Sequence, residues 1–214
     1  MILYSYFRSS AAYRVRIAMH LKGLAPEYRA VHLVKDGGEQ HAPAYRALNP
    51  QGRVPYLIDG QVQLGQSLAI IEYLEETHPL PPLLPRDAAG RARVRSIALA
   101  IAADIQPLQN LSTTRYLEER LGLPQEQRDA WIAHWVAVGL GALETQLGRE
   151  PATGRYCHGD LPTLADCCLV PQMFAARRFG VDVANYPTLA RIDAVCQELP
   201  AVAAAAPARQ PDAS

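Results

Sequence analysis

The chain has 214 residues, of which 49% are hydrophobic and 20% charged, and this composition is typical of folded globular proteins rather than disordered ones. Its 21 Lys and Arg residues balance 21 Asp and Glu residues, so the composition does not predict the concentrated basic surface that nucleic acids need. No apolar run approaches the roughly 18–20 residues that cross a bilayer, and residues 1–8 lack the regions of a signal peptide, so we expect a soluble, cytoplasmic protein.

Predicted strands alternate with predicted helices in residues 1–80. Ser10–Lys22 carry a helical apolar stripe that ends at Gly23, and a second helix is predicted over residues 67–76. Asp59-Gly60 is a hairpin signal between two strands. The segments with strand character are residues 1–6, 27–34, 54–58 and 61–64. This order predicts a small mixed sheet with helices packed on it.

A proline-rich boundary follows the first domain, since four prolines lie within residues 77–85, and we place a linker at 81–90. Residues 91–214 are predicted to form an all-helical second domain in which Thr163 and Asp166 begin one helix as a capping box. The Ala- and Pro-rich residues 201–214 are expected to be loosely held. The predicted helices are residues 91–120, 125–147, 164–179 and 188–199.

The cysteines and histidines do not predict a metal site. The four cysteines, Cys157, Cys167, Cys168 and Cys196, contain no Cys-x-x-Cys spacing, and the six histidines are scattered. We expect buried small thiols in a reducing compartment rather than a disulfide framework.

Two predicted helix N-termini carry the candidate chemistry, because the chain lacks glycine-rich nucleotide loops and a Gly-x-Ser-x-Gly elbow. Ser9-Ser10 and Gln66-Ser67 each begin a helix, where free N–H groups and the helix dipole favour an anion or a thiolate. Both pairs also fit simple capping. Val54-Pro55 begins a strand at an edge or bend, can be cis, and can offer its backbone to an extended peptide ligand.

Longer stretches in both halves of the chain carry a family resemblance. They are Tyr4–Ser10, Arg14–Ala18, Gln66–Glu76, Ile105–Ser112, Leu164–Asp166, Leu169–Gln172 and Arg178-Phe179. Together with the predicted domains, these stretches resemble glutathione transferases and, within them, the zeta class, the maleylacetoacetate isomerases. The resemblance spans nearly the whole chain and implies an α/β thioredoxin-like N-terminal domain followed by an all-α C-terminal domain.

One position departs from the zeta pattern Ser-Ser-Cys, because Ala11 stands where the cysteine is expected. The protein therefore offers no thiol of its own at that position. If the family chemistry is retained, the reactive thiol comes from glutathione, which the resemblance implies as the cofactor.

The resemblance also implies a glutathione site along the first domain. The backbone of Val54 would pair with the cysteinyl unit, Gln66 and Ser67 would hold the γ-glutamyl end, and Gln40 would reach the glycyl end, although its polar loop also fits simple solvation. The implied set is Ser9, Ser10, Gln40, Val54, Pro55, Gln66 and Ser67, with Gln106, Asn110, Leu111 and Ser112 of the second domain as the other wall.

Ser9 is the implied thiolate donor, with Ser10 as the second candidate. A cysteine thiol has a pKa near 8.5 and is mostly protonated at neutral pH. A charge-assisted hydrogen bond is worth roughly 1.5–3 kcal/mol, so one hydroxyl donor lowers that pKa by about one to two units. The thiolate then needs no general base.

The implied reaction is the cis–trans isomerisation of maleylacetoacetate to fumarylacetoacetate in aromatic amino-acid degradation. A thiolate adds to the double bond, the bond rotates, and the thiolate leaves. The substrate carboxylates need cations, for which Arg8 and Arg178 are the candidates, although Arg177-Arg178 also fits a solvated helix face. Arg14 and Arg16 are expected to be structural or interfacial.

Three other functions remain open at this point. The first is maleylpyruvate isomerase, which runs the same chemistry on a shorter dicarboxylate. The second is a transferase that conjugates glutathione to haloacids or other electrophiles. The third is a non-catalytic interaction module of the same fold, which would have no need of the Ser9, Val54, Gln66 and Ser67 set. The resemblance also implies a homodimer.

Overall fold

The computed structural model describes residues 1–213, which form two compact units. Unit 1 consists of Met1–Leu83 together with residues 198–213, and unit 2 is Leu84–Gln197. Among the described residues, no helix has both the length and the apolar character that spanning a membrane requires.

A four-stranded sheet in the order β2-β1-β3-β4 forms the centre of unit 1. Its strands are β1 (Ile2–Ser5), β2 (Glu27–Ala30), β3 (Tyr56–Asp59) and β4 (Val62–Gly65). β1 runs parallel to β2 and antiparallel to β3, which pairs with β4 through the predicted hairpin at Asp59-Gly60. Gly60 has a φ of +57°, which the tight turn requires. The mixed sheet predicted from residues 1–80 is confirmed.

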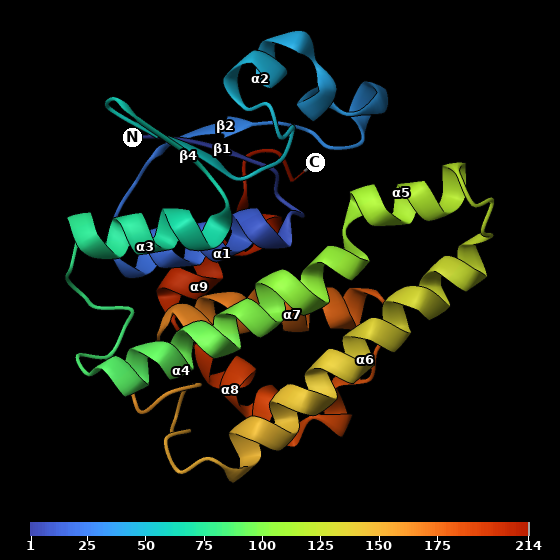
Figure 1. Ribbon diagram of the computed structural model, residues 1–214. Coiled ribbons are helices and arrows are strands. Elements are labelled where there is room, and N and C mark those ends of the chain that lie inside the picture. Colours follow the sequence, from blue (N-terminus) through green and yellow to red (C-terminus); the bar gives the residue numbers. More distant parts are fainter. Residues whose placement is uncertain (214) are drawn as a thin grey trace. The chain divides into compact units, whose positions relative to one another are not determined.

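Helices cover both faces of this sheet. α1 (Ser10–Leu21) and α3 (Ser67–Thr77) lie together on one face and α2 (Pro43–Leu48) lies on the other, as Figure 1 shows. Two short 3-10 turns, Lys35–Gly37 and Glu39–His41, precede α2. The shared core buries apolar side chains of the strands and both helices, among them Leu3, Ile17, Leu57, Ile70 and Leu74. Each contributes roughly 1.5–3 kcal/mol through burial.

The C-terminal segment of the chain belongs to unit 1. Residues 201–214 were expected to be loosely held within the helical domain, but α9 (Pro200–Ala205) packs against α1 and buries Val202 and Ala205. A 3-10 turn, Pro207–Arg209, follows it. The expectation of loose packing is wrong, because small apolar residues fit closely against a neighbouring helix. Ser214 lies outside the described residues.

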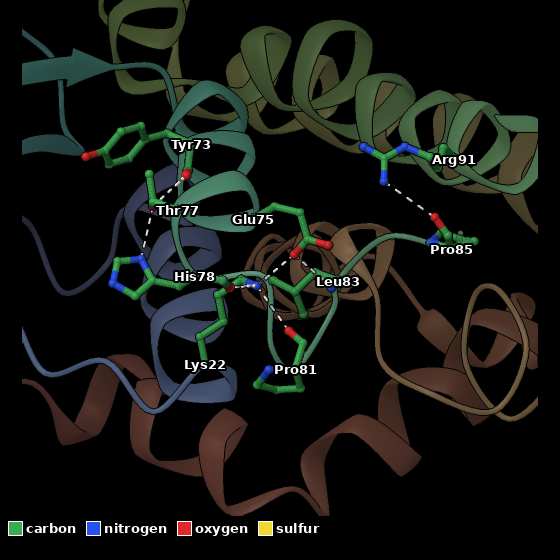
Figure 2. Close-up of polar contacts among 9 residues, drawn as sticks. All are labelled: Lys22, Tyr73, Glu75, Thr77, His78, Pro81, Leu83, Pro85 and Arg91. Atoms are coloured by element: carbon green, nitrogen blue, oxygen red, sulfur yellow. Dashed lines mark hydrogen bonds and ion pairs between the residues drawn. The ribbon is translucent and has the colours of Figure 1, made fainter. Parts of the chain in front are cut away.

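A buried ion pair fixes the proline-rich segment to unit 1 (Figure 2). Nζ of Lys22 lies 2.7 Å from Oε2 of Glu75 and also donates to the carbonyl oxygens of His78 and Pro81, at 2.8 and 3.0 Å. The backbone N–H of Leu83 donates to the same Glu75 oxygen, at 2.9 Å. The carboxylate and the ammonium therefore tie the end of α1 and the end of α3 to the chain that leaves the sheet.

Unit 2 is helical, as expected, and contains no strand within residues 84–197. The predicted single helix over 91–120 is wrong, since Pro107 removes a backbone donor and Asn110 is extended and caps a new helix. The capping box of Thr163 and Asp166 is confirmed. The elements are α4 (Ala88–Leu99), a π-helix (Ala100–Ile105), a 3-10 turn (Gln106–Gln109), α5 (Leu111–Glu119), α6 (Gln125–Arg149), α7 (Leu164–Arg178), a 3-10 turn (Val183–Asn185) and α8 (Pro187–Gln197).

Candidate active site

Ser9 lies at the N-terminus of α1, between the sheet and the helix. Its backbone is extended, and its Oγ accepts a hydrogen bond from the backbone N–H of Ala12 at 3.2 Å, so it is the N-cap. A serine hydroxyl accepts and donates at the same time, so this cap leaves the O–H proton for another acceptor. Capping and thiolate donation are therefore compatible roles for this one side chain.

Ser10 is the first residue of α1 and is partly exposed, as is Ala11 beside it. The first N–H groups of a helix have no partner within it and, with the helix dipole, favour a negative charge at this end. The preceding turn is held by the Ser9 N–H, which donates to the carbonyl oxygen of Tyr6 at 3.0 Å. The start of α1 is therefore a fixed and electropositive position.

Val54 and Pro55 immediately precede β3, whose pairing with β1 begins at Tyr56. The peptide bond between them is cis, as the sequence allowed. Val54 is buried, and its backbone lies at the end of the ladder rather than within it. An extended ligand would add to the sheet at such a position by main-chain hydrogen bonds.

Gln66 and Ser67 begin α3. Gln66 has a φ of +64°, which is strained for a side chain with a Cβ, and its amide donates to Oε1 of Gln51 at 3.0 Å. Oγ of Ser67 accepts a hydrogen bond from Nη1 of Arg14, on α1, at 3.2 Å. The contact brings a buried guanidinium to the N-terminus of α3, which is a favourable place for a carboxylate.

Gln40 is buried rather than solvated, at 5% exposure. Its Nε2 donates to the carbonyl oxygen of Leu33 at 3.2 Å, and its buried Oε1 has no hydrogen-bond partner among residues 1–213. Burying an amide oxygen without a donor is costly. The oxygen is covered by the protein, so it can accept a ligand N–H only after the Gln40 side chain turns.

The remaining residues of the predicted cofactor set lie in unit 2, around the start of α5. Gln106 begins the 3-10 turn and is partly exposed. Asn110 caps α5, because its Oδ1 accepts from the N–H and the hydroxyl of Ser112 at 3.0 and 2.9 Å, and Leu111 is the first residue of the helix. Asn110 and Ser112 therefore have a clear local role at the cap of α5, and their contact with glutathione stays a prediction.

The two arginines predicted to bind substrate are both exposed. The Arg8 guanidinium lies over the ring of Phe7, 4.9 Å from its centroid, and that of Arg178 lies over the ring of Phe179 at 4.6 Å. Arg177 behaves differently from its neighbour, since its Nη2 lies 2.7 Å from Oδ2 of the buried Asp193 on α8. Of the pair on α7, Arg177 is thus a structural residue.

Two buried arginines of α1 support the site. Arg14 and Arg16 are predicted to be structural or interfacial, and a structural role is confirmed, because Arg14 contacts Ser67 and Arg16 donates to the carbonyl oxygens of Tyr6 and Phe7. Sequence reasoning missed the identity of these partners. Burial lowers the pKa of Arg16 to about 10. The only sequence signal for these contacts was the presence of Arg14 and Arg16 within the predicted first helix. A buried arginine needs partners, so each would have to find one.

The four cysteines are all buried and none of them forms a disulfide with another described residue, and burial raises the pKa of the Cys157 thiol well above its ordinary value. Within residues 1–213, no group of three His, Cys, Asp or Glu side chains is arranged to hold a metal ion. Neither observation adds a second reactive centre to the described part of the chain.

Comparison with known proteins places these features in a family context. A family model described as glutathione S-transferase, N-terminal domain, matches residues 3–82. A probable maleylacetoacetate isomerase from Vibrio cholerae is 51% identical over 213 residues, which cover 100% of this chain and 98% of that protein.

Solved structures match over the full length as well. The holo structure of a maleylpyruvate isomerase, a bacterial glutathione S-transferase of the zeta class, has a TM-score of 0.97 and 48% identity and covers 100% of both chains. A maleylacetoacetate isomerase from Methylobacterium extorquens, solved with bound malonate and glutathione, has a TM-score of 0.96 and 46% identity, again with 100% of both chains covered.

Proposed function

The chain belongs to the zeta class of the glutathione S-transferase family, and we propose that it is a glutathione-dependent cis–trans isomerase that converts maleylacetoacetate to fumarylacetoacetate. The observation that carries this proposal is the Ser9 hydroxyl, which caps α1 and keeps a proton to donate at the electropositive end of that helix.

The residues of unit 1 fit glutathione as a cofactor. The buried Oε1 of Gln40 is an acceptor in need of a donor, which a peptide N–H of glutathione would supply once the Gln40 side chain turns. Arg14 and the N-terminus of α3 place positive charge around Ser67, where a γ-glutamyl carboxylate would be stabilised. The relative from Methylobacterium extorquens binds glutathione in its crystal structure.

When bound, glutathione supplies the thiol whose ionised form adds to the double bond of the substrate and leaves after rotation. The protein's contribution is to keep that sulfur ionised, and we assign this task to the hydroxyl of Ser9, with Ser10 as the second candidate. Ala11 has no side chain that reacts, so no protein thiol at this position takes part.

Arg8 and Arg178 are proposed to hold the two substrate carboxylates. Both guanidiniums are exposed and stack on an aromatic ring that limits their motion, which prepares a planar fork for a carboxylate. A dicarboxylate, malonate, is bound in the relative from Methylobacterium extorquens. Gln106, Asn110, Leu111 and Ser112 of unit 2 belong to the proposed glutathione set rather than to the substrate set.

Maleylpyruvate is the second candidate substrate, because a maleylpyruvate isomerase of the zeta class matches the whole chain with a TM-score of 0.97. The two substrates differ in length, so they are separated by comparing kcat/KM for each. A preference for maleylacetoacetate supports the first proposal, and a preference for maleylpyruvate overturns it. Conjugation of glutathione to haloacids or other electrophiles is the remaining alternative, and no feature of the site favours it.

The test of the proposed function is a spectroscopic isomerase assay with and without added glutathione, together with calorimetric titration of glutathione. Turnover that depends on glutathione supports the proposal. Absence of glutathione binding would point instead to a non-catalytic interaction module.

We further propose a cytoplasmic homodimer that acts in aromatic degradation. Four buried cysteines, without a disulfide among the described residues, suit a reducing compartment. The dimer is tested by sedimentation, and a monomer at micromolar concentration would contradict it.

A further inference from the structure

The described C-terminal residues return to the turn that carries Ser9. After α9, the chain reaches Asp212, whose Oδ2 accepts a hydrogen bond from the backbone N–H of Phe7 at 3.0 Å. Its Oδ1 accepts from the hydroxyl of Tyr28, on β2, at 2.7 Å. One carboxylate therefore links three segments that are far apart in the sequence, since Asp212 and Phe7 are separated by 205 positions.

The same turn is held from its other side by Arg16. Nη2 of this arginine donates to the carbonyl oxygen of Phe7 at 3.0 Å, and Nη1 donates to that of Tyr6 at 3.3 Å. Its Nε donates to the carbonyl oxygen of Ala205, the last residue of α9, at 3.0 Å. The N–H and the C=O of Phe7 are thus both occupied, one by a carboxylate and the other by a guanidinium.

This arrangement leaves the backbone before Ser9 little freedom. Phe7 is also 8% exposed, and its ring packs edge-on to the ring of Tyr6, with the centroids 4.8 Å apart. The partly buried Ala213 packs against the same cluster. Two residues after Phe7, the Ser9 N–H is bonded to the carbonyl oxygen of Tyr6. A shift of Phe7 therefore moves the Ser9 hydroxyl.

We propose that Asp212 is a positioning residue that fixes the place of the Ser9 hydroxyl by accepting the Phe7 N–H. The inference rests on the proposed function, because it assigns a role in holding the donor of the thiolate. Misplacing a reacting group by about 1 Å can cost roughly 100-fold in rate, so a lost anchor two residues away has a measurable effect. The proposal places Asp212 in contact with neither the substrate nor the sulfur of glutathione.

The competing explanation is that Asp212 only attaches the C-terminal segment to the domain. Two matched variants distinguish this explanation from the proposed positioning role. Tyr28→Phe removes the other hydrogen bond of the same carboxylate and leaves the Phe7 bond in place. Gln210→Ala removes side-chain bonds to the carbonyl oxygens of Ala204 and Ala206, which hold the segment to itself. None of these three bonds is made to the turn before Ser9.

The experiment measures kcat, KM for glutathione and the pKa of bound glutathione's thiol, from thiolate absorbance, in the full-length variants. We expect Asp212→Ala to lower kcat by about 10- to 100-fold and to raise the thiol pKa, with a smaller change in KM. Asp212→Asn should stay within about 3-fold of the parent protein, because its amide oxygen still accepts the Phe7 N–H. Tyr28→Phe and Gln210→Ala should keep their kcat within about 2-fold.

A folded Asp212→Ala protein with unchanged kcat and thiol pKa would overturn the inference, as would equal losses in all the variants. If Asp212→Ala folds poorly, Asp212→Glu, which moves the carboxylate by one methylene, should show an intermediate loss of kcat, and parental kcat in this variant contradicts the inference. Failure of the proposed function is distinguishable, since the parent protein itself would then show no glutathione-dependent turnover.

Discussion

The guanidinium of Arg14, on α1, donates from Nη1 to Oγ of Ser67 at the first position of α3, over 3.2 Å. The two residues are 2% and 5% exposed, so the charge lies inside unit 1 next to the N-terminus of α3, where we propose that the γ-glutamyl carboxylate binds. The pair orients a hydroxyl and adds a full positive charge to the partial charge of the helix N-terminus.

Replacing Arg14 should weaken glutathione binding. Arg14→Met removes both the charge and the bond to Ser67, and we expect the Kd to rise by about 10-fold, in line with a charge-assisted hydrogen bond of roughly 1.5–3 kcal/mol. Calorimetric titration measures it. Arg29→Met, which removes an exposed arginine paired with Glu27 on β2, is the control and should leave the Kd unchanged. Equal affinities for the parent and Arg14→Met would refute the role.

Ser9→Ala should reduce both catalysis and helix stability. Loss of the thiolate donor is expected to cut kcat by about 10- to 100-fold, and loss of the N-cap to lower the free energy of unfolding by about 1 kcal/mol. Asp87→Ala is the matched control, since Oδ1 of Asp87 caps α4 by accepting from the N–H of Gly90 at 2.7 Å. It should lose stability but keep kcat. If Ser9→Ala retains kcat, Ser10 or the backbone takes over the role.

Replacing each of the two adjacent arginines of α7 should have a different effect: one on substrate binding and the other on stability. Arg178→Ala is expected to raise KM for the dicarboxylate by about 10-fold and to leave glutathione affinity unchanged. Arg177→Ala leaves the buried Asp193 carboxylate without its ion pair and should lower the free energy of unfolding by about 1–3 kcal/mol. Steady-state kinetics and urea unfolding of both variants check this. A loss of glutathione affinity in Arg178→Ala would make that arginine structural.

The Lys22–Glu75 pair predicts a large stability effect (Figure 2). The Lys22 side chain is fully buried, so Lys22→Met leaves the Glu75 carboxylate buried without its cation and should destabilise the protein by about 3–5 kcal/mol. The double variant Lys22→Met/Glu75→Leu should be more stable than Lys22→Met alone, because no charge remains buried. Urea unfolding measures both, and a double variant less stable than the single one would contradict the explanation.

Local signals in the sequence were sufficient for particular turns and helix ends in both units. The hairpin at Asp59-Gly60, the end of α1 at Gly23 and the capping box at Thr163 each depend on neighbouring residues, and the structure has all three. The interruption of the predicted helix over 91–120 was missed, although Pro107 was visible, because the apolar period continues through it.

Contacts between distant segments could not be predicted in this way. The Arg14–Ser67 bond spans 53 positions and the Phe7–Asp212 bond spans 205, and no pattern within one helix or strand encodes either. The burial of Gln40 likewise depends on how its loop folds back on Leu33. Tertiary packing decides these positions, so the residues that support the site were harder to find than the residues that begin its helices.

The most direct test of the central claim is the thiol pKa of glutathione bound to the parent protein and to Ser9→Ala, followed by thiolate absorbance across pH. We predict that the pKa of the bound glutathione thiol lies about one to two units below the value near 8.5 of an ordinary cysteine thiol. In Ser9→Ala, this pKa should rise most of the way back to that ordinary value. A thiol that titrates in the parent complex as it does in free glutathione would contradict the account.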